Sequence, residues 1–502
     1  MTAEPNTEGL PTEKAQRMRL AVFYTLLSRP AVLVLTGLSV AVVARVLDPA
    51  AFGVYAIAYA VFGILSEIGL FGLKPFLVTR EKIDRAVMAR AVGTSLFAGF
   101  SLFLLSGAAL FLLPSSFVPA GFTPTLLLFC GALFVQPLAL ASEAVLERRL
   151  RFGFISLLAV AASAVNAGVA IALVLSGWGI AGLAAAFLAE KLFRTLAFLI
   201  VSPEGRVRPV FKGERQVLVF GSSYSVSTTL PKISGFAILG SLSAILGLPA
   251  VGLYNRAETV VSLVDRAVMS AIKPTILPIF TTAMRSGVPK AEIYTQKLRY
   301  LTALLWPCFV GMIVLAEPLI LTLLGDQWRE AVLPAQVLLV GALAVPFNKM
   351  SLKLFVAFGI LAVYTRIQVG YQLLRVASAA AGAVMLGLPG AALGLAAATM
   401  VKAVLIISAL HRETGQSWSA FIRIQLEGAL VAGFAAAGSC LAFVGPERDV
   451  LWQLLTGGAG AGIAMLLGLL AVRHPALADL LHLLRRRSVP GMPATKTPSF
   501  VR

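Results

Sequence analysis

The sequence predicts an all-α integral membrane protein of about fourteen transmembrane helices. Of its 502 residues, 58% are hydrophobic and only 13% are charged, whereas soluble domains carry about 25% charged residues. The apolar runs reach about 20 residues, enough for a helix to cross roughly 30 Å of hydrocarbon. They do not alternate as the strands of a membrane barrel would. Loops rich in Lys and Arg alternate with loops that lack them, which is typical of polytopic membrane proteins.

The predicted spans follow the apolar runs in chain order: 21–46, 54–73, 89–113, 122–146, 154–175, 179–200, 217–246, 254–281, 299–324, 332–357, 366–386, 389–410, 426–444 and 452–472. We group them into segments: a cytosolic N-terminal segment 1–20, an N-lobe 21–200, an inter-lobe loop 201–216, a C-lobe 217–410, two further spans in 411–473, and a basic cytosolic tail 474–502. The loops are too short to hold a catalytic domain.

Basic residues predict which loops face the cytosol. They gather in the N-terminal segment, in later alternate loops and in the tail, around 74–85, 148–151, 206–215, 285–299, Arg366, Arg412 and 485–487. An even number of spans with both termini in the cytosol places all these loops on one side. The formal net charge of +19 is therefore expected to face the cytosol and anionic lipid, and it does not indicate nucleic-acid binding. The first apolar run is too long for a cleavable signal peptide.

The chain contains an internal repeat. LDPAAFGVY at 47–55 follows the first span, and LGLPAVGLY at 246–254 follows the seventh; GLAAA occurs at 182–186 and again at 394–398. Spans one to six and seven to twelve therefore look like two copies of one six-helix unit. Because six is even, the copies share one orientation and form parallel repeats. Two such lobes that meet at a central cavity are typical of transporters.

Several short motifs resemble those of bacterial polysaccharide flippases, the oligosaccharide branch of the multidrug/oligosaccharidyl-lipid/polysaccharide exporter superfamily. They run in family order from about residue 20 to 350: ARVLDPAAFGVY at 44–55, EIGL at 67–70, ERRLRF at 147–152, LGLPAVGLY at 246–254 with Pro274 and Pro278, and LGDQW at 324–328. The resemblance implies two six-helix lobes that form a V-shaped central cavity, plus two C-terminal helices. The family has no catalytic motif, so we expect a transporter and no enzyme.

The resemblance also implies a substrate, an oligosaccharide repeat unit on undecaprenyl pyrophosphate. This lipid would move from the cytosolic to the periplasmic leaflet of the bacterial inner membrane, for exopolysaccharide, capsule or O-antigen synthesis. Expected partners are membrane lipid and the polymerase and chain-length proteins of an export system. The chain departs from the family in span seven, where members often carry an acidic residue and this chain has Ser234, Gly235 and Phe236 near Lys232. No cofactor is expected; a proton or sodium gradient would drive transport, since no ATP-binding loop is present.

Cations inside the apolar runs are the candidate substrate-binding residues, because charge within a bilayer is costly and tends to be functional. At about 1.5 Å per residue, Arg29 and Arg375 lie roughly 13 Å inside their spans, Arg266 about 18 Å and Lys232 about 22 Å. The alternative is that each pairs with a carboxylate or extends to an interface. For Arg375 substrate binding and this alternative are equally good interpretations, and for Lys273 extension to the interface is the better one. Lys402 is interpreted as the partner of a nearby charge.

Carboxylates in the spans are candidates for ion coupling or gating, Glu67 and Asp265 above all; Glu143 and Glu190 are the others. Aligning the repeats through Gly53 and Gly252 places Glu67 opposite Arg266, so a Glu67–Arg266 or Glu67–Arg29 bridge is one interpretation. A static pair and a proton-coupling site fit equally well. The same kind of alignment places Glu190 opposite Lys402.

No metal or catalytic site is expected. The cysteines Cys130, Cys308 and Cys440 fall inside apolar runs, and no CxxC or His/Cys cluster is present. The alternatives within the superfamily are a lipid II flippase and a cation-coupled drug exporter; spans thirteen and fourteen and the basic bias argue against the exporter. A membrane glycosyltransferase or ligase would need a DxD motif, a long periplasmic loop or a His cluster, which the sequence lacks.

Overall fold

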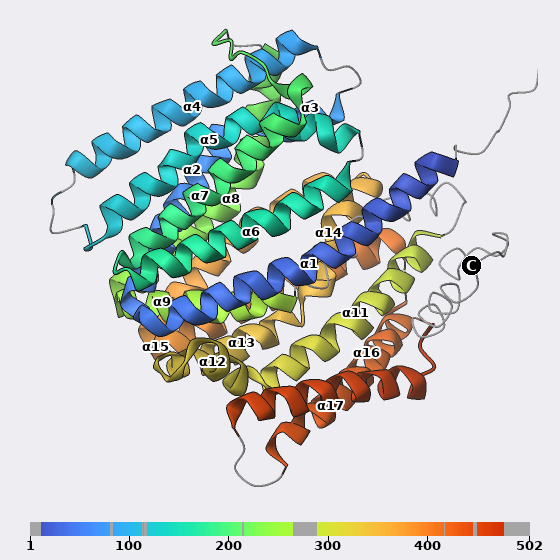
Figure 1. Cartoon of the computed structure of the whole chain (residues 1–502). Coiled ribbons are helices and arrows are strands. Elements are labelled where there is room, and N and C mark those ends of the chain that lie inside the picture. The colour runs from blue at the N-terminus through green and yellow to red at the C-terminus, as the bar shows by residue number, and fades with distance from the viewer. Residues whose placement is uncertain are drawn as a thin grey trace, which may run out of the picture. The chain divides into compact units, whose positions relative to one another are not determined.

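The computed structural model describes residues 12–80, 84–112, 114, 118–149, 151–212, 215–264, 289–415, 417–444 and 449–475 (Figure 1). Within these ranges all regular structure is helical, and 10 helices are long and apolar enough to cross a membrane. The predicted all-α membrane fold is confirmed. Contacts divide the chain into an N-terminal unit, residues 1–240, and a C-terminal unit, residues 241–502.

The helices of the N-terminal unit match the predicted spans closely. They are α1 (Thr12–Val46), α2 (Pro49–Leu70), α3 (Leu73–Thr79), α4 (Arg85–Leu112), α5 (Phe122–Arg148), α6 (Phe152–Leu175), α7 (Gly179–Val201), the short 3₁₀ helix η2 (Pro203–Gly205), and the greater part of α8 (Arg215–Leu246).

Helix α2 begins at a side-chain cap and ends at a turn with positive φ. The Asp48 side chain accepts a hydrogen bond from the Ala51 amide at 2.7 Å, and Pro49 occupies the first helical position. At the other end Phe71 and Gly72 both have positive φ, 52° and 58°. A Cβ on Gly72 would lie 2.4 Å from the Tyr224 ring, so this turn needs glycine. The turn lies at the end of the predicted span 54–73, and it places Lys74 on a short helix of its own, α3.

Helix α5 is central to the N-terminal unit. It packs against α2, α3, α4 and α7, while α1 lies along α6 (Figure 1). The first part of α8 returns to α2 and α3: the Phe220 and Phe76 rings are 5.4 Å apart, and the Ser225 hydroxyl donates to the Glu67 carbonyl at 3.2 Å. The division between the units therefore falls inside α8, whereas the sequence analysis assigned the whole of span 217–246 to the second lobe.

The C-terminal unit begins with the end of α8. It continues with α9 (Leu248–Val264), α11 (Lys290–Val314), α12 (Ala316–Leu324), η4 (Asp326–Ala331), α13 (Val332–Ala342), α14 (Val345–Ala357), α15 (Leu361–Thr414), α16 (Trp418–Ser439), η5 (Cys440–Phe443) and α17 (Val450–Ala471). Helices α11, α16 and α17 pack together, and α13 and α14 pack against α15 (Figure 1). Two predicted spans, 299–324 and 332–357, each consist of two helices.

Helix α15 is a hairpin of two arms, which correspond to the predicted spans 366–386 and 389–410. The break is at Gly387, with φ 66° and ψ −148°, and Pro389 follows. Near this tip the arms are in backbone contact: a Cβ on Gly382 would lie 2.1 Å from the Gly390 carbonyl oxygen, and one on Gly394 would lie 2.1 Å from that of Ser378. Small residues permit such close approach of membrane helices.

Candidate functional site

The N-terminal unit encloses a polar cavity of about 290 Å³, here called the N-terminal pocket. Helices α2, α3, α5, α7 and α8 all contribute to its lining. The polar side chains on the wall include Glu67, Lys74, Gln136, Glu143, Lys191 and Arg194. A cavity in which several ionisable groups converge inside a membrane protein is a candidate functional site.

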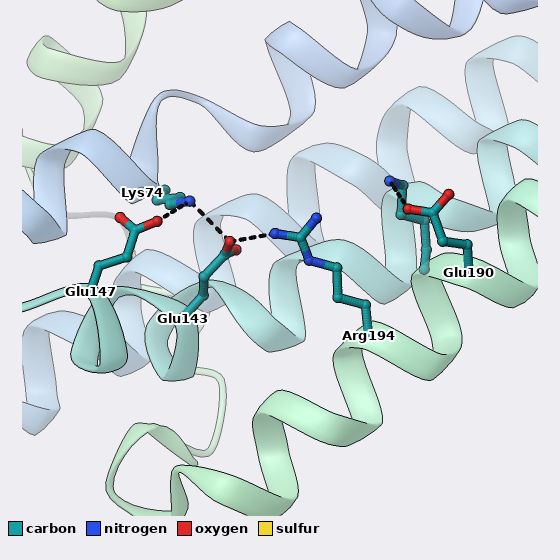
Figure 2. A network of polar contacts seen from close by, with 6 residues as sticks. Lys74, Glu143, Glu147, Glu190 and Arg194 are labelled. Atoms are coloured by element: carbon teal, nitrogen blue, oxygen red, sulfur yellow. Dashed lines mark hydrogen bonds and ion pairs between the residues drawn. The ribbon is translucent and has the colours of Figure 1, made fainter. Parts of the chain in front are cut away.

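Glu143 of α5 is the centre of this pocket's charge network (Figure 2). It is only 8% exposed, and its Oε1 accepts from Lys74 Nζ at 2.9 Å and from Arg194 Nη2 at 2.8 Å. Lys74 Nζ also lies 2.6 Å from Oε1 of Glu147, one helical turn further along α5. The result is an alternating chain, Glu147–Lys74–Glu143–Arg194, in which the buried charge is fully paired, as the low dielectric requires.

The network continues along α7. Lys191 Nζ lies 3.1 Å from Glu190 Oε1 and 4.6 Å from the centre of the Phe187 ring, so it makes a cation–π contact as well as an ion pair. Glu67, on α2, differs from the other acidic residues of the pocket. Its side chain is half-buried, and no ion pair joins it to another residue in the described ranges. Glu67 is thus a carboxylate that lines the pocket and forms no ion pair with a residue that the structure describes.

The C-terminal unit has a second cavity of about 410 Å³, here called the C-terminal pocket, lined by the two arms of α15. Lys402 is 9% exposed there, and its Nζ lies 4.5 Å from the centre of the Tyr371 ring. Among the residues that the structure describes, no carboxylate lies within ion-pair distance of Lys402. Its charged neighbours are the cations Arg375 and Lys349. The expectation that Lys402 pairs with another charge is therefore not met within the described chain.

Arg375 stands beside this pocket and has a partner that the sequence did not indicate. Its Nη2 lies 3.7 Å from Glu258 Oε1 on α9, and the Arg375 side chain is 21% exposed against 50% for Glu258. The pair is long and open on one side. The ion pair matches one of the two interpretations of Arg375, and its role toward a substrate stays a prediction.

The other predicted site residues divide into two groups. Arg29 on α1 and Lys232 on α8 are exposed and form no ion pair with another described residue. A Cβ added to Gly63 of α2 would lie 4.0 Å from Lys232 Nζ. Arg266, Asp265 and Lys273 lie outside the described residues, so the Glu67–Arg266 bridge remains an expectation. No Glu67–Arg29 ion pair is present in the described structure.

Sequence reasoning missed the cations of the N-terminal pocket. Lys74 was counted as a loop charge that sets topology, whereas the turn at Phe71 and Gly72 places it on α3 beside α5. Lys191 and Arg194 were not considered. A usable signal existed: Glu143 and Glu147 are four residues apart, as are Glu190 and Arg194, the spacing at which side chains share a helix face. Within the described ranges, no group of three or more His, Cys, Asp or Glu residues is arranged to hold a metal.

Comparison with known proteins shows the family of this chain. A family profile described as "Polysaccharide biosynthesis protein" matches residues 42–333. The "Succinoglycan biosynthesis transport protein ExoT" of Rhizobium meliloti (strain 1021) is 27% identical over 328 residues, which are 64% of this chain and 65% of that protein. The match thus spans just under two thirds of the relative's own length.

Solved structures show the same fold. A lipid II flippase, MurJ, in an inward closed conformation superimposes with a TM-score of 0.69 at 14% identity, over 91% of this chain and 100% of that one. An outward-facing multidrug resistance MATE family transporter of the MOP superfamily gives a TM-score of 0.54 at 17% identity, over 81% and 99% of the two chains. These similarities show that the chain shares the fold of these two structures.

Proposed function

Because this chain belongs to the polysaccharide biosynthesis protein family, we propose that it is a flippase for an undecaprenyl-pyrophosphate-linked oligosaccharide repeat unit. It would move this lipid from the cytosolic to the periplasmic leaflet of the bacterial inner membrane. The family match carries the proposal, and two observations support it: the relative named as a succinoglycan transport protein and the multi-pass helical fold. The polymer would be an exopolysaccharide, a capsule or an O-antigen, with both termini of the chain in the cytosol.

The costly step is to carry a pyrophosphate past hydrocarbon, and cations in a water-filled cavity lower that cost. We infer that Arg29, Lys232, Arg266, Lys273 and Arg375 serve this purpose in alternating access. Arg29 and Lys232 support the inference, because each is an exposed cation on a membrane helix with no ion pair to another described residue. Charges in this position are stable only where water or an anionic ligand reaches them.

We also infer that a proton or sodium gradient drives transport, with Glu67 or Asp265 as the coupling or gating carboxylate. Glu67 supports this inference, since it faces a polar cavity and lacks an ion-pair partner among the described residues. A carboxylate in such a cavity can exchange its proton as the cavity opens to one side and then the other. The product would be passed to polymerase and chain-length proteins in the same membrane.

The cationic cavity is tested by polymer export from cells that carry single variants in place of the native chain. We expect Arg266→Ala to abolish export while the protein stays in the membrane. Arg266→Lys should keep part of the activity, because either cation attracts a phosphate. Arg29→Ala and Lys232→Ala should also impair export. Arg329→Gln, which removes an exposed ion pair to Glu317, is the matched control and should export normally. Normal export by all three alanine variants would exclude a cationic substrate cavity.

Two roles of Glu67 are separated by a charge exchange. If Glu67 bridges Arg266, Glu67→Gln should impair transport and Glu67→Arg combined with Arg266→Glu should restore some of it. If Glu67 takes up protons, Glu67→Gln should lose transport at normal protein yield and the exchange should not restore it. Wild-type transport by Glu67→Gln over a range of pH would exclude both roles.

The alternative function that an observation supports is that of a lipid II flippase, because the fold superimposes on that of one. Growth of cells depleted of their lipid II flippase would distinguish the two substrates. We expect this chain to restore polymer export in a strain that lacks it, and to leave the lipid II-depleted strain unable to grow. The reverse result would replace the proposal.

A further inference from the structure

We propose that the C-terminal pocket is a binding site for an anionic, phosphate-headed membrane lipid, whose phosphate lies between Lys402 and Arg366 and whose first chain carbons lie against the apolar wall. This inference goes beyond the flippase proposal and does not depend on it, because it concerns one pocket within the C-terminal unit. Three properties of the pocket carry it: its shape, its charge and its opening.

The shape follows from how the arms of α15 pack. Near the tip, Gly382 and Gly390 bring the two backbones into contact. About three turns from Gly382, a Cβ added to Gly370 meets nothing within 4 Å, and Gly370 lines the pocket. The arms thus enclose an open space away from the tip. Its volume of about 410 Å³ is within the range of about 300–1,000 Å³ that small-molecule sites occupy.

The charged side chains that line this pocket are cations, which favours an anionic ligand. Lys402 is 9% exposed and has no carboxylate partner in the described chain, while its charged neighbours Arg375 and Lys349 are cations. The Tyr371 ring, 4.5 Å from Nζ, compensates part of the desolvation. A buried ammonium normally requires a paired anion. Arg366, on the other arm of α15, is a second cation that lines the pocket, and it is exposed. Two cations that have no carboxylate partner among the described residues leave a place for a ligand's phosphate.

The opening shows where the ligand comes from. Leu374, Val401 and Leu405 line the pocket and are 40%, 45% and 48% exposed. They lie on a helix that is long and apolar enough to span the membrane, and in this proposal their exposed apolar surface contacts lipid chains. A ligand that enters past these side chains comes from the bilayer, and the cations select a negative headgroup.

The depths of the cations fit a lipid near one membrane surface. Arg366 lies about 8 Å and Tyr371, beneath Lys402, about 15 Å along α15 from its first residue. Arg366 is therefore near the interface, and Lys402 is about one and a half turns deeper. A phosphate held between them leaves its hydrocarbon to follow Ile367 and Leu374 inward. An anionic glycerophospholipid and a polyprenyl phosphate share this chemistry.

The test is native mass spectrometry of the purified full-length protein, with phosphatidylglycerol, phosphatidylcholine, undecaprenyl phosphate or inorganic phosphate added. We expect one equivalent of phosphatidylglycerol or undecaprenyl phosphate to be retained in preference to phosphatidylcholine. Preference for undecaprenyl phosphate would identify the carrier lipid as the occupant, and preference for phosphatidylglycerol a resident bilayer lipid. Lys402→Met should weaken retention about tenfold, as expected for a lost charge-assisted contact. Lys191→Met is the matched control. Lys191 also lies over an aromatic ring but is paired with the carboxylate of Glu190, so this change should leave lipid retention unaltered.

A second variant separates loss of binding from loss of folding. Gly370→Leu fills open space without a clash and raises helix propensity, so it should unfold at the same temperature as the native chain or higher while it excludes the lipid. Three results would overturn the proposal: equal retention of phosphatidylcholine and phosphatidylglycerol, unchanged retention in both Lys402→Met and Gly370→Leu, or inorganic phosphate bound as tightly as the lipids. Because binding is measured without transport, none of these results depends on the flippase proposal.

Discussion

The N-terminal and C-terminal pockets differ in how their buried charges are balanced. At the N-terminal pocket, Glu143 pairs with two cations of the wall, and the wall lysines Lys74 and Lys191 pair with Glu147 and Glu190. In the C-terminal pocket Lys402 is buried with no anionic partner in the described chain. Each carboxylate of this network has a cation beside it, whereas no carboxylate of the described chain pairs with Lys402, and we propose a ligand there. Charge balance, more than the presence of charge, separates a structural network from a binding site inside a membrane protein.

The largest effect should come from breaking the balanced network. Glu143→Gln leaves Arg194 without its ion-pair partner, and removing one member of a buried pair costs about 3–5 kcal/mol. We expect a large drop in unfolding temperature and in the yield of folded protein, measured in detergent. Glu147→Gln is the control, because Glu147 is more exposed and Lys74 keeps Glu143. Equal losses in the two variants would show that Glu143 is not the centre of the network.

Lowering the pH should destabilise the protein through a residue of the C-terminal unit, His474. His474 follows α17 and is buried edge-on against the Tyr300 ring at 5.6 Å. Burial, together with the positive charge of Arg299, lowers the pKa of His474 from 6.5 to about 4. Above pH 6.5 the folded and unfolded states are both neutral here. As pH falls toward 4 the unfolded state takes up a proton that the folded state does not, so stability is lost, by about 2 kcal/mol at pH 5.

The measurement is the unfolding temperature of the native chain and of His474→Phe at pH 7 and pH 5. Phenylalanine keeps the ring contact and cannot take up a proton, so the variant should lose less stability on acidification. An identical loss in both proteins would assign the acid sensitivity to other groups, such as the carboxylates of the N-terminal pocket.

The smallest expected effect is a gain in stability rather than a loss. Lys402→Met removes a buried charge that has no anionic partner in the described ranges, and an apolar side chain of similar length should raise stability in lipid-free detergent by about 1 kcal/mol. Glu258→Gln is the control within the same unit: its pair with Arg375 is 3.7 Å long and Glu258 is half exposed, so the change should be near zero. A marked loss of stability in Lys402→Met would mean that Lys402 is compensated after all, and the contrast between the pockets would fail.

The fold could be predicted because the signals are local. Apolar runs located the helices, although α1 begins at Thr12 where 21 was predicted and α11 at Lys290 where 299 was predicted. Gly387 with Pro389 separates the arms of α15 at the predicted boundary. The break between α2 and α3 could not be predicted. It depends on Phe71 in a left-handed conformation and on the Tyr224 ring against Gly72, a contact supplied by a helix far along the chain.

The site was less predictable because ion pairs depend on packing. Glu143 and Glu190 stood out as charges in apolar runs, yet their partners are set by how α3, α5 and α7 meet. Lys74 and Arg194 occupy the ends of spans, where a cation ordinarily sets topology. The repeat alignment matched Glu190 with Lys402, whereas the structure pairs Glu190 with its neighbour Lys191 and places Lys402 over Tyr371.

The glycine contacts at the tip of α15 limit how this protein can evolve. At Gly382, Gly390 and Gly394, even a methyl group would overlap a backbone carbonyl oxygen of the other arm. These positions should reject every substitution in a saturation mutagenesis scan, whereas Gly370 on the same hairpin should accept many. Homologues that diverge in sugar or lipid preference are therefore expected to change at the open end of the hairpin and to keep its tip.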